Sequence, residues 1–554
     1  MKQIINIIVN QIIIFIILGS LVGILSHYFT EIAIFSAEFV RSSVDYKSVG
    51  FIGWNATLKI AIALLAAAIF ISLIVRFGKI DRFHGPADVI LASLDKKEPI
   101  RIKAGLISGL VSSTSLCAGA PVGQYGPLVH LSATLASFLR RLEKVGNINK
   151  QLLIGSSVSA AIASAFGAPI GGIIFSQEVI LRNFTLKYFV PISISSASSF
   201  ITVNYLFGNE NLIHIERSFN INPVYMMIVI IVGLLGGSLA YAYSRLLLEM
   251  NKIAGRTGIP LCWRPFIAII PLIMIGSYIP QILGLGVETI SNVLTNQLSI
   301  WVLVAILLTK LVFTPFSISF GFFGGVFSPA LFIGVSLGAL VGSIFCDAFG
   351  LGKELIPLFA ICGLGAVVAP TIGGPIATVI LILEMSQNFH ASTVAMLCVV
   401  IAMSTFRLMS QSSFFEMQLL GRGFDLSVGM KNFQLSRILI GEIPRSECCV
   451  VQEDIDQDEM IKKMQKLAVS EGYIVDHKSH LVKKINIVNI FHPSYFSEDD
   501  TLVFYEDQNL LEAVDLASDF VGESIPIVSR KGCFIGAVTE GDLFQAVQTH
   551  STDD

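Results

Sequence analysis

Apolar residues gather in long runs over the first three quarters of this chain, with polar residues held in short gaps between them. About half of the runs approach or exceed the roughly 20 residues that cross a bilayer as a helix. Others are too short to span and are broken by Gly and Pro, as in helices around a transport site. The pattern predicts helices at about 4–27, 51–76, 104–120, 127–140, 151–168, 170–182, 187–207, 224–247, 264–284, 300–318, 326–346, 355–369, 373–386 and 391–410.

The first of these runs follows Lys2 and superficially resembles a signal peptide. The run Ile4–Leu25 is longer than the apolar core of such a peptide and lacks a clear cleavage site. We therefore interpret it as the first membrane helix.

The composition divides the chain in two. Of its 554 residues 53% are hydrophobic and 14% charged, and the mean hydropathy of +0.74 is far too apolar for a soluble protein of this size. The 40 acidic and 37 basic residues make 77, and 34 of these fall in Phe424–Asp554. We therefore expect a membrane domain over 1–423 and a soluble α/β domain over 424–554.

The distribution of basic residues predicts the orientation. Arg140, Arg141, Lys144 and Lys150 form one cluster, Lys252, Arg256 and Arg264 a second, and Arg407 and Arg422 follow the last apolar run, whereas the loop 208–223 carries Glu210, Glu216 and a single Arg217. Basic loops stay on the cytoplasmic side, which places the tail there. The net charge of −3 comes without a basic stripe for nucleic acid. The eight Cys show no metal-ligand spacing, so we expect no metal site. We also expect no catalytic site and no required cofactor.

Two glycine-bearing stretches stand inside runs that lack Asp, Glu, Lys and Arg. Gly123–Pro127 lies within Ala104–Leu139, and Gly325–Pro329 lies within Leu311–Cys346. Each is interpreted as a turn feeding a helix at membrane depth. A helix start offers unpaired N–H groups and the positive end of its dipole, so it suits an anion. The two starts together predict one anion site.

The two stretches also mark an internal repeat. Pro127 is followed 42 residues later by Pro169, and Pro329 is followed 46 residues later by Pro375. A glutamate, Glu178 or Glu384, comes nine residues after each second proline. We infer a duplication with halves at about 15–247 and 264–420, built as an inverted repeat with broken, tilted helices.

These residues resemble the chloride channel and transporter (CLC) family over about 15–425. Four family motifs have counterparts in order, at Phe83–Asp88, Gly123–Pro127, Gly325–Pro329 and Ser413–Glu416. The resemblance implies a homodimer in a membrane, each subunit with its own pathway for chloride or a similar monovalent anion. The resemblance also implies that the protein is located in a bacterial inner membrane. The residues implied to line the pathway are His84, Gly85, Gln124, Tyr125, Gly126, Gly325, Val326, Phe327 and Phe415.

The chain departs from the family at both proton-handling positions. The family's gating carboxylate is replaced by Tyr125, a phenol that stays neutral at ordinary pH and cannot compete as an anion. The family's proton-relay carboxylate is replaced by Val179. Glu178 is a possible substitute, although its repeat counterpart Glu384 favours a structural role for both. Tyr125 is therefore expected at the gate, either plugging the path or donating a hydrogen bond to the ion.

The hydroxyl groups that the family aims at its central anion site are also replaced. The ungapped match keeps Asp88 in place and puts His84 at the serine position. The alternative register aligns Pro86 with the family's proline and puts Phe83 there instead. Phe415 stands where the family has tyrosine and offers only a ring edge.

The tail resembles a pair of cystathionine-β-synthase-type (CBS) repeats. The stretch 500–544 carries Gly536, Thr539 and Asp542, which match the signature that holds a ribose in that family. An earlier copy, 443–490, is degenerate and lacks the signature. The resemblance implies a dimer strut or an adenine-nucleotide site.

Taken together, these features predict a voltage- or ligand-modulated passive anion channel and not an enzyme. Three alternatives stay open: an atypical proton/anion exchanger, a nonconducting membrane scaffold, and a metal or osmolyte transporter. Metal transport needs oxygen ligands inside the membrane, and the two motif-bearing runs contain no carboxylate.

Overall fold

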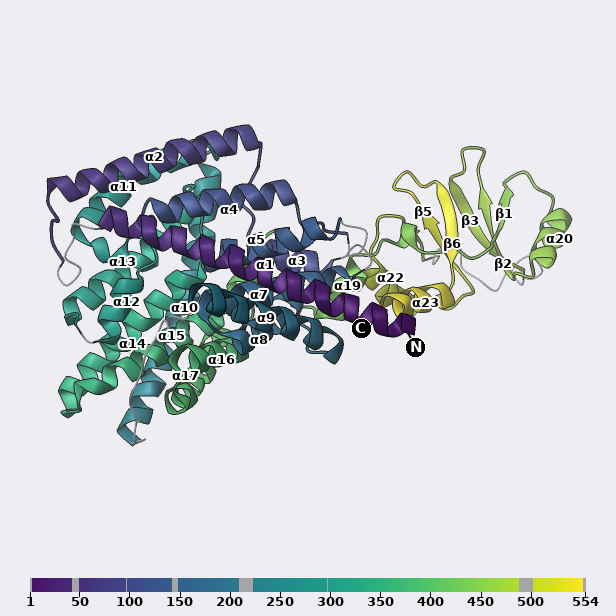
Figure 1. Cartoon of the computed structure of the whole chain (residues 1–554). Coiled ribbons are helices and arrows are strands. Elements are labelled where there is room, and N and C mark those ends of the chain that lie inside the picture. Colours follow the sequence, from purple (N-terminus) through teal and green to yellow (C-terminus); the bar gives the residue numbers. More distant parts are fainter. Residues whose placement is uncertain are drawn as a thin grey trace. The chain divides into compact units, whose positions relative to one another are not determined.

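The computed structural model describes residues 2–41, 49–95, 97–141, 148–208, 223–295, 297–487 and 502–551. It divides the chain into two compact units, Met1–Ser427 and Val428–Asp554 (Figure 1). The sequence predicted a boundary four residues earlier, at 423/424. Several residues used in the sequence analysis lie outside the described part of the chain: Lys144, Glu210, Glu216, Arg217, Ile490 and Asp500.

The first unit is helical throughout the described residues. Its elements are α1 (Lys2–Arg41), α2 (Trp54–Gly78), α3 (Pro86–Leu94), α4 (Ile102–Cys117), α5 (Tyr125–Leu139), α7 (Lys150–Phe166), α8 (Pro169–Phe175), the π-helical turn η1 (Ser176–Leu181), α9 (Leu186–Phe207), α10 (Pro223–Arg256), α11 (Arg264–Tyr278), η2 (Pro280–Ile282), α12 (Val287–Leu294), α13 (Ile300–Ser319), α14 (Phe327–Phe349), η3 (Lys353–Leu355), α15 (Ile356–Ile372), α16 (Pro375–Ser386), α17 (Phe389–Met409) and α18 (Phe414–Leu420).

Within the described residues, eight helices are long and apolar enough to cross a membrane. These candidate spans are Val9–Phe35, Trp54–Gly78, Leu186–Phe207, Pro223–Arg256, Ile300–Ser319, Phe327–Phe349, Lys353–Ile372 and Phe389–Leu420. Each of the fourteen predicted apolar segments falls on a helix. The prediction of an all-helical, multi-pass membrane domain is therefore confirmed.

The first helix is longer than the sequence analysis predicted. The predicted segment ended near residue 27, whereas α1 continues to Arg41. No Gly or Pro follows Gly23 before Gly50, so nothing in this stretch stops the helix. Three short helices, α3, α12 and α18, were not among the predicted segments.

Each half contains one pair of consecutive helices that are separated by the same kind of break. α7 ends at Gly167, which has a φ of 63°, and α8 begins at Pro169. α15 ends at Gly373, with a φ of 75°, and α16 begins at Pro375. A left-handed glycine ends a helix without strain, and a proline fits the first position of the next helix. α8 and α16 then pack against each other.

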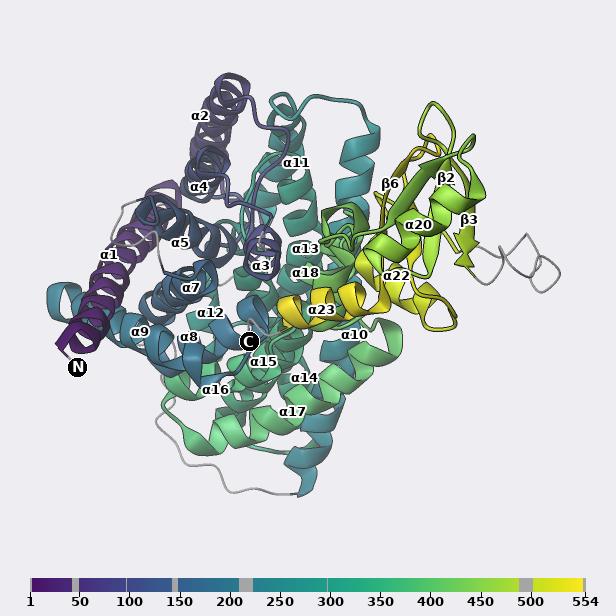
Figure 2. The same cartoon turned by 90° about the vertical axis from the view of Figure 1, so that its right-hand side faces the viewer.

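The second unit contains two three-stranded sheets of the same topology. Figure 2 labels β2 and β3 of one sheet and β6 of the other. In each sheet the first strand pairs in parallel with the second across a helix, and the second pairs antiparallel with the third. The elements are α19 (Met430–Ser436), η4 (Ile440–Glu442), β1 (Cys449–Gln452), α20 (Gln457–Leu467), β2 (Glu471–Val475), β3 (Leu481–Asn486), β4 (Phe504–Tyr505), α22 (Leu510–Ala517), β5 (Ile525–Val528), β6 (Phe534–Val538) and α23 (Glu540–Ser551).

Single β-bridges connect the two halves of this unit. Ser446, just before β1, pairs with Ala537 in β6, and His480 pairs with Cys533. Each half has its own apolar core, one around Phe504 and Ile527 and the other around Val451 and Met464. The repeated topology agrees with an internal repeat in the tail, while its assignment to the CBS type stays a prediction.

Candidate functional site

The helix starts of α5 and α14 meet face to face, although they are two hundred residues apart in sequence. The Gly123 N–H donates to the Gly325 carbonyl at 2.8 Å, and the Gly325 N–H donates to the Gly123 carbonyl at 2.5 Å. This two-bond bridge fixes the two turns as one unit. Both stretches were predicted from the sequence to form one site, and the structure brings them together.

Glycine is required at this junction because the two backbones approach so closely. A Cβ on Gly123 would lie 2.6 Å from the Gly325 oxygen, and a Cβ on Gly325 would lie 2.6 Å from the Gly126 nitrogen. A Cβ on Gly126 would lie 2.9 Å from the Gly325 Cα. Any side chain here would push the helix starts apart.

The first N–H groups of both helices are left open. Among the described residues, no hydrogen bond takes up the N–H of Tyr125, Gly126 or Phe327. The Gln124 N–H reaches the Ser328 hydroxyl at 3.4 Å, and the buried Gln124 Oε1 has no partner within the described chain. The Val326 carbonyl accepts from the Tyr243 hydroxyl at 3.3 Å. These donors, at the positive ends of two helix dipoles, form a site suited to a small anion.

Aromatic rings surround the Tyr125 side chain. Its ring stacks on Phe166, with centroids 3.9 Å apart, and meets the edge of Phe327 at 5.3 Å. Phe166 and Phe327 lie 5.1 Å apart, and Phe175 lies 6.4 Å from Phe327. Tyr125 is 6% exposed, so this cluster, which we call the aromatic cage, encloses it. Neither Phe166 nor Phe175 was predicted from the sequence to belong to the site.

Glu178 and Glu384 each cap the start of a helix in the other half of the membrane unit. The Glu178 carboxylate accepts from the N–H groups of Ile376 at 3.1 Å and Ala377 at 2.7 Å, at the start of α16. The Glu384 carboxylate accepts from Ile170 at 3.0 Å and Gly171 at 2.6 Å, at the start of α8. This reciprocal pair of caps supports the structural interpretation of both glutamates.

The neighbouring relay position contains no ionisable group. Val179 lies in the π-helical turn η1 and is 2% exposed. Its Cγ2 methyl lies 2.6 Å from where a Cβ on Gly374 would stand. Val179 is thus packed against the break between α15 and α16 and has no proton to carry.

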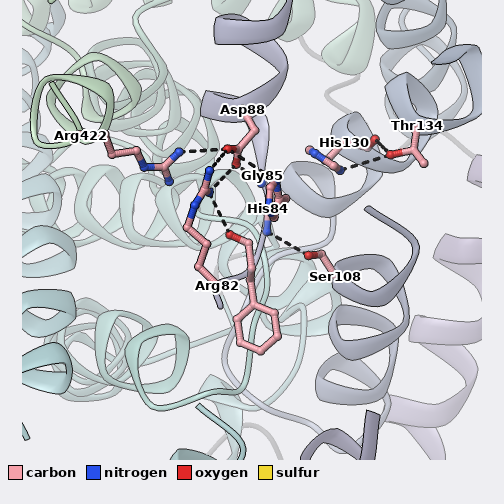
Figure 3. Close-up of polar contacts among 9 residues, drawn as sticks. Arg82, His84, Gly85, Asp88, Ser108, His130, Thr134 and Arg422 are labelled. Carbon is pink, nitrogen blue, oxygen red and sulfur yellow. Dashed lines mark hydrogen bonds and ion pairs between the residues drawn. The ribbon is translucent and has the colours of Figure 1, made fainter. Parts of the chain in front are cut away.

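His84 belongs to a polar cluster around Asp88 (Figure 3). Arg82 donates two hydrogen bonds to the Asp88 carboxylate, at 2.6 and 3.1 Å, and Arg422 donates a third at 3.0 Å. The Gly85 N–H adds a fourth at 2.9 Å, which fixes the start of α3. The two guanidinium groups reach the carboxylate from different sides.

The histidine ring itself faces α4 and α5. Its Nδ1 lies 3.6 Å from the Asp88 carboxylate, its backbone N–H donates to the Ser108 hydroxyl at 2.9 Å, and its ring centroid lies 5.6 Å from that of His130. A cavity of about 120 Å³ lies beside it, lined among others by His84, His130 and Arg101. Gly126 still lies close to this region, because a Cβ there would be 3.6 Å from Pro86. The pathway role of His84 stays a prediction.

Phe415 is buried near the start of α18, which packs against α3 and α15. Glu416 accepts from the Ser413 N–H at 2.5 Å and from the Arg182 guanidinium at 2.5 Å, so the start of this helix is fixed. Phe415 contributes no hydroxyl group. Its role in the pathway stays a prediction.

The signature residues of the tail bond to each other. One Asp542 carboxylate oxygen accepts from the Thr539 hydroxyl at 2.9 Å, the Thr539 N–H at 2.8 Å and the Ser446 hydroxyl at 2.5 Å. The Arg445 Cδ lies 2.5 Å from where a Cβ on Gly536 would stand. The groups expected to hold a ribose are thus engaged within the protein, and nucleotide binding stays a prediction.

Comparison with known proteins places this arrangement among anion channels and transporters. The chain matches, over residues 66–407, the family model described as "Voltage gated chloride channel". It is 26% identical over 369 residues to the voltage-gated ClC-type chloride channel ClcB of Escherichia coli, covering 66% of this chain and 86% of that protein. It is 25% identical over 299 residues to an uncharacterized protein of Methanocaldococcus jannaschii, covering 54% and 73% of the two chains.

Solved structures share the fold at lower sequence identity. A slow cyanobacterial Cl⁻/H⁺ antiporter superposes with a TM-score of 0.65 and 20% identity, covering 75% of this chain and 98% of its own. A eukaryotic CLC transporter gives 0.64 and 16%, covering 97% and 98%. A CLC-type fluoride/proton antiporter gives 0.61 and 21%, covering 74% and 98%.

Proposed function

Because the chain belongs to the voltage-gated chloride channel (CLC) family, we propose that it conducts chloride or a similar monovalent anion down its gradient without moving protons. The observation that carries this proposal is Tyr125. It occupies the gate position between the two open helix starts, and it is held there by aromatic rings and not by a charge.

The paired helix starts support weak binding of an anion. Backbone N–H groups at Gly126 and Phe327 carry partial charges, so they hold an anion less firmly than a lysine would. Conduction needs an ion to enter and leave such sites readily. Buried glycines keep the donors close together, as the 2.6 Å approach at Gly325 indicates.

The absence of proton coupling is supported at two positions. A neutral phenol at position 125 has no carboxylate proton to exchange within the ordinary pH range. Val179 has no ionisable group, and neighbouring Glu178 is engaged with the N–H groups of α16. A proton entering by this route would have to break a helix cap.

Proton-coupled exchange is the second candidate. It is favoured by two of the solved structures that share the fold, which are described as antiporters. Glu178, the carboxylate next to the relay position, would then be the proton carrier. A nonconducting scaffold, with Tyr125 as a permanent plug, is the third.

A flux assay on the full chain in liposomes distinguishes these functions. We expect chloride efflux with a potassium ionophore present and no proton uptake against a pH gradient. Proton movement driven by a chloride gradient would establish the exchanger. Tyr125→Ala removes aromatic contacts of about 0.5–1.5 kcal/mol each, so we expect faster efflux, by up to about tenfold. No efflux from either form would favour the scaffold.

Replacing the missing carboxylates provides the matched test. Tyr125→Glu should make flux depend on pH, because a carboxylate competes with the anion when charged and not when protonated. Tyr125→Glu with Val179→Glu supplies both groups of a proton route. Val179→Leu is the control, since it changes the size of the side chain and adds no ionisable group.

We also propose the family assembly and orientation for this chain: a homodimer with one pathway in each subunit, in a bacterial inner membrane, with the C-terminal unit cytoplasmic. Exposed apolar residues on α9 and α17, including Ile201, Tyr205 and Met396, leave a surface for lipid or a second subunit. The C-terminal unit would act as a CBS-type modulator, binding an adenine nucleotide or serving as a strut. We propose no catalytic activity.

Two measurements address these points. Single-molecule subunit counting in liposomes checks for two subunits in each particle. Calorimetric titration of the full chain with ATP checks the nucleotide site, with Asp542→Asn as the variant that removes the signature carboxylate.

A further inference from the structure

A basic cavity lies at one end of α5, apart from the paired helix starts. It encloses about 120 Å³. One water occupies about 10–15 Å³ on this measure, so there is room for roughly eight to twelve waters or for a phosphate group. The cavity is lined by Pro99, Ile100, Ala136, Ser137, Arg140, Lys150, Leu153 and Ile154.

The lining has two cations and no carboxylate. Lys150 donates to the main-chain carbonyls of Asp95 at 3.2 Å and Glu98 at 2.5 Å, which hold it in place without neutralising its charge. The Arg140 main-chain N–H donates to the Ala136 carbonyl at 3.0 Å, whereas its guanidinium group makes no hydrogen bond or ion pair with any described residue. Lys150 precedes the apolar part of α7, outside the candidate spans. Burial lowers the pKa of Lys150 to about 8, and the nearby Arg140 charge adds to that shift, while the charges of Asp95 and Glu98 oppose it. An anion between the two cations would relieve their repulsion.

Apart from Ser137, the remaining lining is apolar, and an exposed apolar side chain lies close to it along the chain. The apolar lining residues are Pro99, Ile100, Ala136, Leu153 and Ile154. Phe138, two residues before Arg140 on α5, is 52% exposed. Arginine and lysine beside exposed apolar side chains are typical of the boundary between hydrocarbon and water. The anion that suits this position has both a charged group and an apolar part.

We propose that this cavity binds the phosphate group of an anionic phospholipid from the cytoplasmic leaflet, with Arg140 and Lys150 as its ligands. Arg140 supplies the forked donor that matches a phosphate, and Lys150 a held point charge. The leaflet follows from the basic cluster, since anionic lipids attract basic segments on the cytoplasmic side. The proposal is independent of how the chain conducts anions.

Native mass spectrometry of the full chain in detergent tests the proposal, with palmitoyl-oleoyl-phosphatidylglycerol as the probe and the phosphatidylcholine of the same chains as the neutral comparison. We expect phosphatidylglycerol to be retained in preference. Arg140→Ala should weaken its retention about fivefold, the effect of one basic residue near an anionic surface. Lys150 is left unchanged, because removing it would also release two loop carbonyls.

Arg141→Ala is the matched control. It removes the same charge from the next residue, which is exposed and does not line the cavity. We expect retention of phosphatidylglycerol within about twofold of the unmodified chain. Equal losses in the two variants would overturn the proposal, because retention would then follow total charge alone. A further arm adds inorganic phosphate without lipid. If it occupies the site and displaces phosphatidylglycerol at equal concentration, the ligand is free phosphate, and the lipid assignment is wrong.

Discussion

The membrane unit contains two pairs of helix starts that differ in whether a carboxylate accepts hydrogen bonds from their N–H groups. At α8 and α16, a glutamate from the other half accepts both exposed N–H groups. At α5 and α14, no carboxylate is present, and the N–H groups of Gly126 and Phe327 have no partner among the described residues. A helix start that is capped by a carboxylate has a structural role. A helix start without such a cap leaves its positive end available to a mobile ion.

The comparison also explains why glycine and aromatic residues are concentrated at one pair. The open starts are held together by backbone bonds between Gly123 and Gly325, and no side chain is needed there. The space above them is filled by the aromatic cage around Tyr125. A carboxylate beside the start of α5 or α14 would cap these helices, as Glu178 and Glu384 cap α16 and α8.

Gly325→Ala should have the largest effect, because it breaks the open pair. Its Cβ would meet backbone atoms of Gly126 at 2.6 and 3.1 Å, and neither atom can move alone. We expect a destabilisation of about 1–3 kcal/mol, as for other overpacked sites, together with loss of anion flux. Thermal unfolding in detergent and liposome efflux measure the two effects.

Gly255→Ala is the control for that substitution. Gly255 lies in α10 with no atom within 4 Å of a new Cβ, so alanine should leave stability unchanged or raise it slightly. Normal flux through Gly325→Ala would show that the two helix starts need not stay in contact for conduction.

Glu178→Gln should weaken the capped pair without changing the open one. A neutral amide has one acceptor oxygen in place of two charged ones, so at least one N–H of α16 loses its bond. We expect a loss of about 1.5–3 kcal/mol of stability and passive flux that persists. Differential scanning calorimetry and the efflux assay measure this.

Glu384→Gln is the matched variant from the other half. The symmetry of the caps predicts a similar loss of stability. If Glu178→Gln left stability intact and altered the pH dependence of flux, Glu178 would be a proton carrier and the structural interpretation would be wrong.

Phe166→Leu should act on the cage alone. It removes the ring stacked 3.9 Å from Tyr125 and keeps an apolar side chain in its place. The lost stacking, about 0.5–1.5 kcal/mol, should raise efflux severalfold, by less than Tyr125→Ala. Phe175→Leu, whose ring lies 6.4 Å from Phe327, should change efflux less. The reverse order would place the constriction elsewhere.

Tyr125→Phe should have the smallest effect. The cage holds Tyr125 through its ring, so efflux should stay within about twofold of the unmodified chain. A rise as large as that of Tyr125→Ala would indicate that the hydroxyl group, and not the ring, keeps the path closed.

The sequence was informative wherever function depends on residue type within one stretch. The spacing of Gly123 and Pro127, the copy at Gly325, and the equal Pro-to-Glu distances all predicted which segments matter. The apolar runs located most helices to within a few residues. The exceptions are the ends of α1, where no breaker defines a limit, of α10, which continues to Arg256, and of α11, which stops at Tyr278. Local propensity and hydrophobic length determine these features.

Apart from the two helix starts, which were predicted to form one site, the sequence was silent on contacts between distant segments. Glu178 reaches an N–H 199 residues away, and Arg422 reaches Asp88 across 334 residues. Similarly, nothing local indicates that Phe166 stacks on Tyr125, because a phenylalanine in an apolar run is typical of any membrane helix. Such contacts follow from tertiary packing, which a single sequence does not reveal.

The exchanged glutamates have a consequence for how a chain like this can arise. Each half supplies the group that completes a helix in the other, just as two identical subunits would do across a twofold axis. A half-length ancestor could therefore have assembled as a pair before gene fusion joined the copies. Fusion would have required no new contact at these caps, only a linker. The same exchange makes each half dependent on the other, so splitting the chain between them should yield fragments that fold together and not separately.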